Sequence, residues 1–305
     1  MAEGVLYFST MAMLVKLVSE RIPTNEIVLA RTGVTFVLSS VALYRLRIRP
    51  WEGPRGWLTL RGFAGFVALQ CYVHSLATLP LGEATLIQYT SPVFTALFAA
   101  LWLGEGAGRG AWLGTLLSLA GMVAVARPAT LFGTGAAFAP TDVLVAFMGA
   151  VFAGFAYVVI RRMKSLADPM VIVWSVPAVG LPLTLVLLAG QWWLLGESPV
   201  VPRGVEWLQL LAIGVLTQAA QVRMTQALHL EAAGRAAAVT YLQVALSVAW
   251  GLLVFSEVPT LFTLLGAACI MGGTVVASGA VGRSSSSASG DGLAPATEQR
   301  SDHAR

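Results

Sequence analysis

The segment LATLPLGEATLIQYTSPVFTALFAALWLGE, residues 76–105, aligns without gaps to LHLEAAGRAAAVTYLQVALSVAWGLLVFSE, residues 228–257. The offset is 257 − 105 = 152 residues, and it places Tyr89 on Tyr241 and Glu105 on Glu257. The same offset matches six more residues with identical ones, namely Leu76, Gly82, Ala84, Leu101, Gly114 and Gly121 with Leu228, Gly234, Ala236, Leu253, Gly266 and Gly273. The chain therefore contains an internal repeat.

The composition places this repeat in a membrane. Of the 305 residues, 57% are hydrophobic and 11% are charged, whereas soluble domains have about 25% charged residues. The net charge of +4 is better explained by loop placement than by nucleic-acid binding. The two cysteines, Cys71 and Cys269, lie in apolar runs and form no disulfide framework or thiol–metal motif. No cleavable signal peptide is recognised.

Ten runs approach the roughly 20 apolar residues that a helix needs to cross a bilayer. They are residues 2–18, 27–44, 57–76, 82–103, 110–126, 142–160, 170–190, 206–228, 234–255 and 260–281. Each repeat holds five runs, and because five is odd, the two repeats must have opposite orientations in the membrane. We predict an all-α integral membrane protein with ten transmembrane helices in two inverted five-helix repeats, residues 1–128 and 142–282, with an outer connecting loop, 129–141, and a disordered cytoplasmic tail, 283–305.

The distribution of Lys and Arg predicts the orientation. With the amino terminus inside, the inner loops hold ten cations and the outer loops hold three, which are Arg21, Arg127 and Arg203. The ten are Arg45, Arg47, Arg49, Arg55, Arg109, Arg161, Arg162, Lys164, Arg235 and Arg283. We therefore expect a multi-pass protein of the plasma (inner) membrane with both termini in the cytoplasm.

These segments, together with KLVSERIPTNEIVLARTG at residues 16–33, resemble the ten-helix drug/metabolite transporter superfamily in its EamA-repeat branch. The resemblance covers nearly the whole chain except the tail. It implies a secondary transporter for amino acids, organic anions, S-adenosylmethionine-type metabolites or nucleotide sugars. It also implies a cavity lined by the first, third, fourth, sixth, eighth and ninth spans, with the fifth and tenth at the periphery.

Polar residues form a stripe on the fourth span. Gln88, Ser91 and Thr95 fall at i, i+3 and i+7, and Pro92 between them removes a backbone donor and kinks the helix. The repeat offset maps the stripe to Thr240, Gln243 and Ser247 on the ninth span. The two stripes either face a substrate, with Tyr89 and Tyr241 beside them, or join helices through hydrogen bonds worth about 0.6–2 kcal/mol each.

Two further spans carry polar side chains in the same pattern. Gln70 and His74 lie four residues apart on the third span, and Gln218, Gln221, Thr225 and His229 follow one stripe of the eighth. They either line the pathway or pack between helices. His74 could take up a proton near neutral pH or serve as a structural histidine. The histidines have no metal-ligand spacing, and no metal or cofactor is expected.

Three cations inside the predicted spans are candidates for binding substrate. Lys16 and Arg31 fall about 5 and 8 Å below the outer surface, and Arg223 lies about 9 Å from the inner end of its span. They either bind substrate or reach headgroups, with Glu83 as an alternative partner for the outer pair and Glu231 for Arg223.

The carboxylates indicate the charge of the substrate. All of those near the membrane lie at span ends, and Glu105 and Glu257 are interpreted as structural, because a negative charge suits the start of the next helix. Cations without a central acid favour an anionic or zwitterionic substrate and export, facilitated diffusion or exchange rather than a dedicated Na⁺ or H⁺ site. A cation or drug efflux carrier and a passive channel remain alternatives. An intramembrane enzyme is not favoured, because no acid/base or metal constellation is recognised.

Small residues repeat at intervals of four on two spans. Gly110, Gly114 and Ser118 do so on the fifth, and Gly273 and Ala277 on the tenth. This spacing allows close helix contact, either within the chain or across a homodimer.

Overall fold

The computed structural model describes residues 2–103, 109–126, 138–194, 196, 198–230 and 233–288. Within these ranges the description omits the side chains of residues 2, 103, 109–111, 126, 224–230, 233–241 and 277–288. The described residues form eleven helices and no strand. The helices are α1 (Ala2–Ser19), α2 (Thr24–Leu46), α3 (Arg55–Thr78), α4 (Leu81–Gln88), α5 (Ser91–Leu103), α6 (Arg109–Ala126), α8 (Pro140–Met163), α9 (Pro169–Leu194), α10 (Val205–Leu230), α11 (Ala233–Phe255) and α12 (Leu261–Ala288).

Each predicted span corresponds to one helix except the fourth, which is divided into α4 and α5. The helix stops at Gln88 and restarts at Ser91, and the Thr90 hydroxyl donates to the Ile87 carbonyl oxygen at 2.7 Å. Pro92 is the second residue of α5, a position where its missing N–H is tolerated. At the other end of the chain, α12 continues to Ala288, six residues beyond the predicted end of the second repeat at residue 282.

Several helices are long and apolar enough to cross a membrane. Five spans in the described residues qualify by length and hydropathy, and they are Thr24–Leu46, Leu81–Trp102, Pro140–Met163, Pro169–Leu194 and Val205–Arg223. Large apolar side chains such as Val186, Trp193 and Leu253 are exposed on the outside of the bundle. Such a surface suits lipid, and the chain is a multi-pass membrane protein.

Several contacts between helices of the two repeats have matching contacts between the equivalent helices. In this correspondence α1 matches α8, α2 matches α9, α3 matches α10, the α4–α5 pair matches α11, and α6 matches α12. The α3–α8 contact has its counterpart in α1–α10, and the α5–α8 contact has its counterpart in α1–α11. The α2–α9, α4–α11 and α6–α12 contacts each join a helix to its own equivalent. The fold therefore has an approximate two-fold axis.

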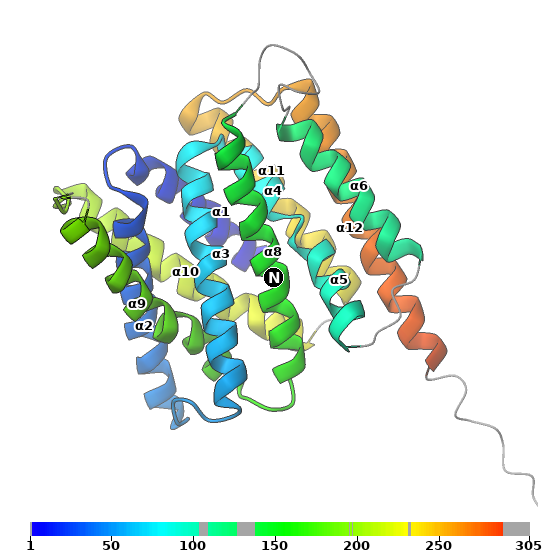
Figure 1. The fold of residues 1–305 in the computed structure, drawn as a ribbon, viewed down its shortest axis with the longest axis horizontal. Coiled ribbons are helices and arrows are strands. Elements are labelled where there is room, and N and C mark those ends of the chain that lie inside the picture. The colour runs from blue at the N-terminus through cyan, green and yellow to red at the C-terminus, as the bar shows by residue number, and fades with distance from the viewer. Residues whose placement is uncertain are drawn as a thin grey trace, which may run out of the picture.

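The packing of α6 on α12 shows that the repeats run in opposite directions. A Cβ on Gly121 would lie 2.7 Å from the Gly266 carbonyl oxygen, and one on Gly273 would lie 2.6 Å from the Gly114 carbonyl oxygen. Moving along α6 thus means moving backwards along α12, as Figure 1 shows. The 152-residue offset exchanges these two contacts. The small-residue faces containing Gly114, Ser118 and Gly273 are used within the chain, and the surroundings of Gly110 and Ala277 lie outside the description.

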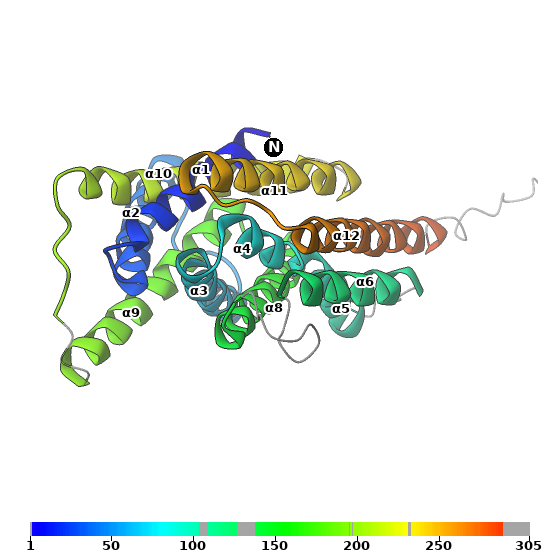
Figure 2. The same ribbon diagram turned by 90° about the horizontal axis from the view of Figure 1, so that it is seen from above.

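The helices form three groups. In both views α2, α9 and α10 lie on one side and α5, α6 and α12 on the other, with α1, α3, α4, α8 and α11 between them (Figures 1 and 2). The largest buried cluster includes Met11, Val15, Ile27, Leu76 and Ile87. Most of it lies near one end of the bundle, which contains the end of α1 and the α3–α4 turn. We call this end the Lys16 end and the opposite end the Arg223 end.

Candidate functional site

An ion pair joins the two repeats at the Lys16 end. Lys16 Nζ lies 2.6 Å from Glu257 Oε1 and donates to the Leu79 carbonyl oxygen at 2.7 Å. The Leu81 N–H donates to Glu257 Oε2 at 2.8 Å, and Lys16 also lies over the Phe255 ring at 5.4 Å. Glu257 thus holds α1 and the α3–α4 turn of the first repeat against the α11–α12 connection of the second.

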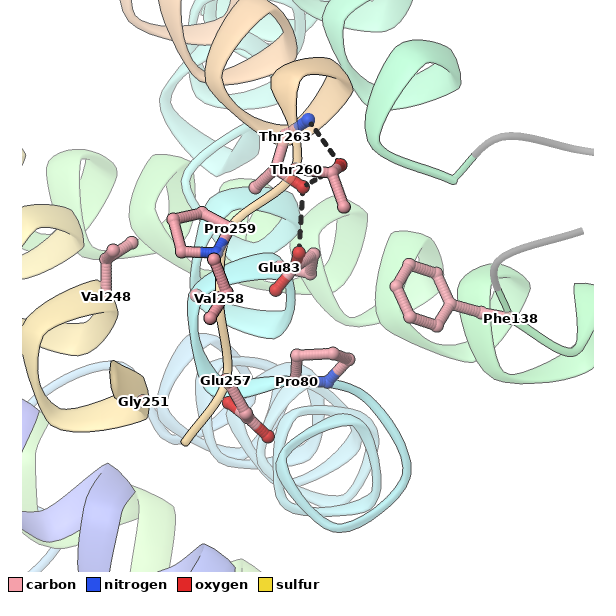
Figure 3. A pocket seen from close by; sticks show the side chains of 11 residues that line it. Pro80, Glu83, Phe138, Val248, Gly251, Glu257, Val258, Pro259, Thr260 and Thr263 are labelled. Carbon is pink, nitrogen blue, oxygen red and sulfur yellow. Dashed lines mark hydrogen bonds between the residues drawn. The ribbon is translucent and has the colours of Figure 1, made fainter. Parts of the chain in front are cut away.

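This geometry corrects the expected partner of Lys16. The sequence offered Glu83, but the Glu83 carboxylate accepts from the Thr263 hydroxyl at 2.8 Å. Glu83 and Glu257 both line a pocket of about 210 Å³ beside the α11–α12 connection, where Figure 3 shows the Glu83–Thr263 hydrogen bond. Glu257 therefore has a structural role, as expected, but its partners are Lys16 and the start of α4 rather than the next helix.

Two more contacts between the repeats close this end. His74 Nε2 lies 3.0 Å from Asp142 Oδ1 and joins α3 to α8. Arg21, in the α1–α2 turn, is ion-paired with Glu206 at the start of α10, and this hydrogen bond raises the pKa of Arg21. His74 thus makes a structural contact in this conformation.

A hydrogen bond between α4 and α11 crosses the middle of the bundle. The Tyr89 hydroxyl, at the break between α4 and α5, donates to Gln243 Oε1 at 2.5 Å. Farther along α11, Ser247 is fully buried and its hydroxyl has no hydrogen-bond partner among the described residues. These three predicted site residues come together where the two repeats meet. The side chains of Thr240 and Tyr241 lie outside the description.

The stripe on the fourth span has a different orientation from the predicted one. The Thr95 hydroxyl donates to the Ser91 carbonyl oxygen at 2.9 Å and lies 3.3 Å from the Gly154 carbonyl oxygen on α8. A Cβ on Gly149, also on α8, would lie 3.6 Å from Gln88 Oε1. Gln88 and Thr95 therefore face α8, not the stripe on α11. Gln88 on α4 and Thr95 on α5 thus share a face across the break at Tyr89–Thr90, as their spacing predicts, but that face contacts α8.

A buried arginine on α2 has no ion-pair partner among the residues that the structure describes. Arg31 is 6% exposed, its Nη1 makes no hydrogen bond, and its side chain forms no ion pair with any described residue. The Tyr72 hydroxyl on α3 is within electrostatic range of the Arg31 guanidinium and is also without a hydrogen-bond partner in the described part of the chain. Thr85 lies beside Tyr72 and donates its own proton to the Leu81 carbonyl oxygen at 2.7 Å, so its oxygen is the nearby acceptor for the Tyr72 hydroxyl.

The remaining predicted residues lie apart from this group. Gln70 donates to Asn25 Oδ1 at 2.7 Å, and Asn25 donates to Gln191 Oε1 at 2.8 Å, which links α3, α2 and α9. Gln70 therefore points away from His74 despite their spacing of four. Arg223 lies at the opposite end, 3.5 Å from Glu3, and its side chain is 57% exposed. The predicted alternative partner, Glu231, lies outside the described residues.

Two residues of interest were missed by the sequence reasoning. One is Tyr72, because nothing in the apolar run around it indicates that its hydroxyl matters. The other is Arg61 on α3, whose Nε is buried without a hydrogen-bond partner among the described residues, with Tyr157 in electrostatic range. Arg61 lies inside α3, which begins at Arg55, and also inside the predicted span of residues 57–76. A cation four residues into a span was the available signal for it.

Comparison with known proteins gives a consistent result. The model of the EamA-like transporter family matches residues 3–127 and 141–279. The pseudopaline exporter CntI of Pseudomonas aeruginosa is 32% identical over 265 residues, which cover 87% of this chain and 89% of that protein. Human solute carrier family 35 member G1 is 30% identical over 231 residues, 73% of this chain and 62% of that protein, and a riboflavin transporter of Vibrio cholerae is 26% identical over 82% of this chain and 81% of its own.

A solved crystal structure shares the fold, with a TM-score of 0.62, 23% sequence identity and coverage of 92% of this chain and 96% of the other. The two matched segments correspond to the two halves of the structure, and the resemblance drawn from the sequence is confirmed. The chain is a ten-span transporter of the drug/metabolite transporter superfamily, and it belongs to the EamA-like transporter family.

Proposed function

We propose that this protein moves a small anionic or zwitterionic metabolite across the inner membrane by alternating access, through export, facilitated diffusion or exchange. The observation that carries the mechanism is the Tyr89–Gln243 hydrogen bond, which joins the two repeats at the helix break in α4–α5. Inverted repeats place the substrate between the halves near the midplane, and irregular backbone at that depth lines the site.

In this proposal the Lys16 end faces the outside and is the closed gate. The Lys16–Glu257 ion pair and the His74–Asp142 contact hold the two repeats together there. Opening requires these two contacts and the Arg21–Glu206 ion pair to separate, while Pro92 lets α4 move without α5. Both chain termini then lie in the cytoplasm, where Arg223 attracts the substrate.

The charge of the substrate follows from Arg31, Arg61 and Arg223. None of these three side chains is neutralised by a buried carboxylate in the described part of the chain, since the one partner, Glu3, has a side chain that is 66% exposed. An anionic or zwitterionic substrate supplies the missing charge.

Counterflow in proteoliposomes tests the proposal. Vesicles preloaded with one unlabelled compound, either an amino acid, an organic acid or a phosphate ester, should accumulate the labelled form of the same compound. Uptake without stimulation from the opposite side would indicate a channel. Stimulation confined to organic cations would indicate the alternative, a cation efflux carrier.

A further inference from the structure

We infer that Arg31 anchors an oxyanion group of the substrate, a carboxylate or a phosphate, and that Lys16 does not. This inference rests on the proposed function and assigns the binding group within it. It separates two cations that the sequence presents as equivalent, since both lie on apolar helix flanks next to the same turn.

The first observation is that Arg31 lies inside the bundle rather than at its surface. Its side chain is 94% buried, and the helix rise of 1.5 Å per residue places it about 10 Å from the start of α2. A residue at that depth with so little exposure does not extend into the headgroup region. The anchoring account of Arg31 is therefore not supported by its position.

The second observation is that five acids at the Lys16 end are engaged elsewhere, while Glu20 is exposed in the α1–α2 turn. At the Lys16 end Glu26 accepts from the Val200 N–H at 2.9 Å, Glu83 accepts from Thr263, Asp142 lies against His74, Glu206 is paired with Arg21, and Glu257 is paired with Lys16. None of the five forms an ion pair with Arg31. The charge of Lys16 is already matched and that of Arg31 is not.

The third observation is a set of hydrogen-bonding groups at a common depth. Arg31 Nη1, the Tyr72 hydroxyl, the Ser247 hydroxyl and Trp250 Nε1 are all buried without partners among the described residues. They lie about 8–12 Å from the Lys16 ends of α2, α3 and α11. Tyr72 and Trp250 also pack against the same buried cluster. All four groups can donate a hydrogen bond, which suits an acceptor-rich ligand group.

The chemistry of arginine specifies that group. A guanidinium presents parallel N–H donors that match the two oxygens of a carboxylate or phosphate, and it stays protonated inside proteins. A buried charge without a partner destabilises the protein that carries it. Binding an oxyanion would remove that penalty, and the free energy gained in this way would strengthen binding.

Thermal unfolding of purified full-length protein tests this assignment. Arg31→Met keeps the length and apolar packing of the side chain and removes the unpaired charge, so the Tm should hold or rise. Lys16→Met is the matched control, because it leaves the Glu257 carboxylate without its cation, and its Tm should fall. A fall in Tm for Arg31→Met as large as that for Lys16→Met would overturn the assignment.

Ligand response gives the second measurement. We would measure the Tm shifts caused by L-glutamate and citrate, by inorganic phosphate and glycerol phosphate, and by choline as a cationic control. An oxyanion that raises the Tm of the wild type should raise that of Lys16→Met and Arg31→Lys but not that of Arg31→Met. The carboxylate and phosphate arms show which source of oxyanion the site prefers.

The outcomes remain separable from those of the proposed function. A wild-type protein without counterflow contradicts transport by alternating access, whatever the stability of the variants. An equal ligand response in the wild type and in Arg31→Met contradicts the anchor even when counterflow is present. If none of the probes shifts the wild-type Tm, the comparison of the two methionine variants decides.

Discussion

The α6–α12 contact and the α4–α11 contact lie on the same approximate two-fold axis, but their chemistry is opposite. In α6–α12, backbone meets backbone at glycines, and the Ser118 hydroxyl lies 3.3 Å from the carbonyl oxygen of Ile270. In α4–α11, one helix is interrupted at Tyr89–Thr90, and among the described side chains the Tyr89 hydroxyl donates a hydrogen bond to Gln243. In the proposed mechanism the first contact is a rigid peripheral support and the second is where the repeats separate.

This contrast has a physical cause. Close backbone packing leaves no room for rearrangement, because each atom displaced creates either a clash or a void. A side-chain hydrogen bond at a helix break can be exchanged for one to a ligand or to water with little net change in free energy. Symmetry alone therefore does not identify the moving part of the carrier, whereas the chemistry of each contact does.

The largest expected effect comes from filling the α6–α12 contact. Gly121→Leu places side-chain atoms where a Cβ already lies 2.7 Å from a backbone oxygen, and overpacking of this kind costs about 1–3 kcal/mol or more. Thermal unfolding in detergent should show a marked fall in Tm, and Gly273→Leu should match it. Gly190→Ala on α9, where nothing lies within 4 Å, should raise stability by about 0.5–1 kcal/mol. A tolerated leucine at Gly121 would refute the rigid contact.

Next in size is the ion pair at the closed end. Glu257→Gln weakens the charge-assisted hydrogen bonds to Lys16 and Leu81, which are worth about 1.5–3 kcal/mol each, so the Lys16 end should open more often. A cysteine at Ser247, in a chain with Cys71 and Cys269 replaced by serine, should then react faster with a membrane-impermeant maleimide added outside. Glu3→Gln is the control. Equal labelling in both variants would show that the ion pair does not keep this end shut.

A smaller effect is expected at the crossing of α4 and α11. Tyr89→Phe removes one hydrogen bond, for a loss of about 0.5–1.5 kcal/mol. Combined with Gln243→Leu in a double-mutant cycle, it should show a coupling energy in that range in the ligand-free protein. Saturating substrate should reduce the coupling, because the contact separates in the transport cycle. Coupling that is unchanged by substrate would make this contact as fixed as α6–α12.

The smallest effect is predicted at the Arg223 end. The Arg223–Glu3 pair is 3.5 Å long and both side chains are more than half exposed, so Arg223→Ala should change unfolding stability by less than about 0.5 kcal/mol. For the Arg223→Ala variant, the substrate concentration that gives half-maximal uptake should rise when substrate is added from the cytoplasmic side alone. A large loss of stability would mean that this pair, like Lys16–Glu257, joins the repeats firmly.

Much of the fold could be predicted because the repeat constrains it twice. The 152-residue offset identified the pairs Gly114–Gly266 and Gly121–Gly273, and these glycines meet crosswise in the structure. The span limits were also near, since proline and polar turns interrupt the apolar runs. The partner of Lys16 was not predictable in the same way, because Glu83 and Glu257 are both acids at the same end and only loop packing distinguishes them.

The candidate site was predicted less well, for reasons visible in single residues. Gln88 and Thr95 share a face, as their spacing predicts, but that face packs against α8 rather than α11. Tyr72 carries a hydroxyl whose environment is set by α2 and α4, not by its own neighbours in sequence. Periodicity predicts which residues share a face, but it does not predict which distant helix that face contacts.

The hydrogen bond between Ser118 and Ile270 joins two positions that are 152 residues apart, so each is the other's counterpart. A contact between two equivalent positions is what two copies of one half would form if they assembled as an antiparallel dimer about a two-fold axis. The present chain can therefore be regarded as a fused pair. Cut between residues 127 and 137 and coexpressed as two polypeptides, its halves should find each other in the bilayer and restore the carrier.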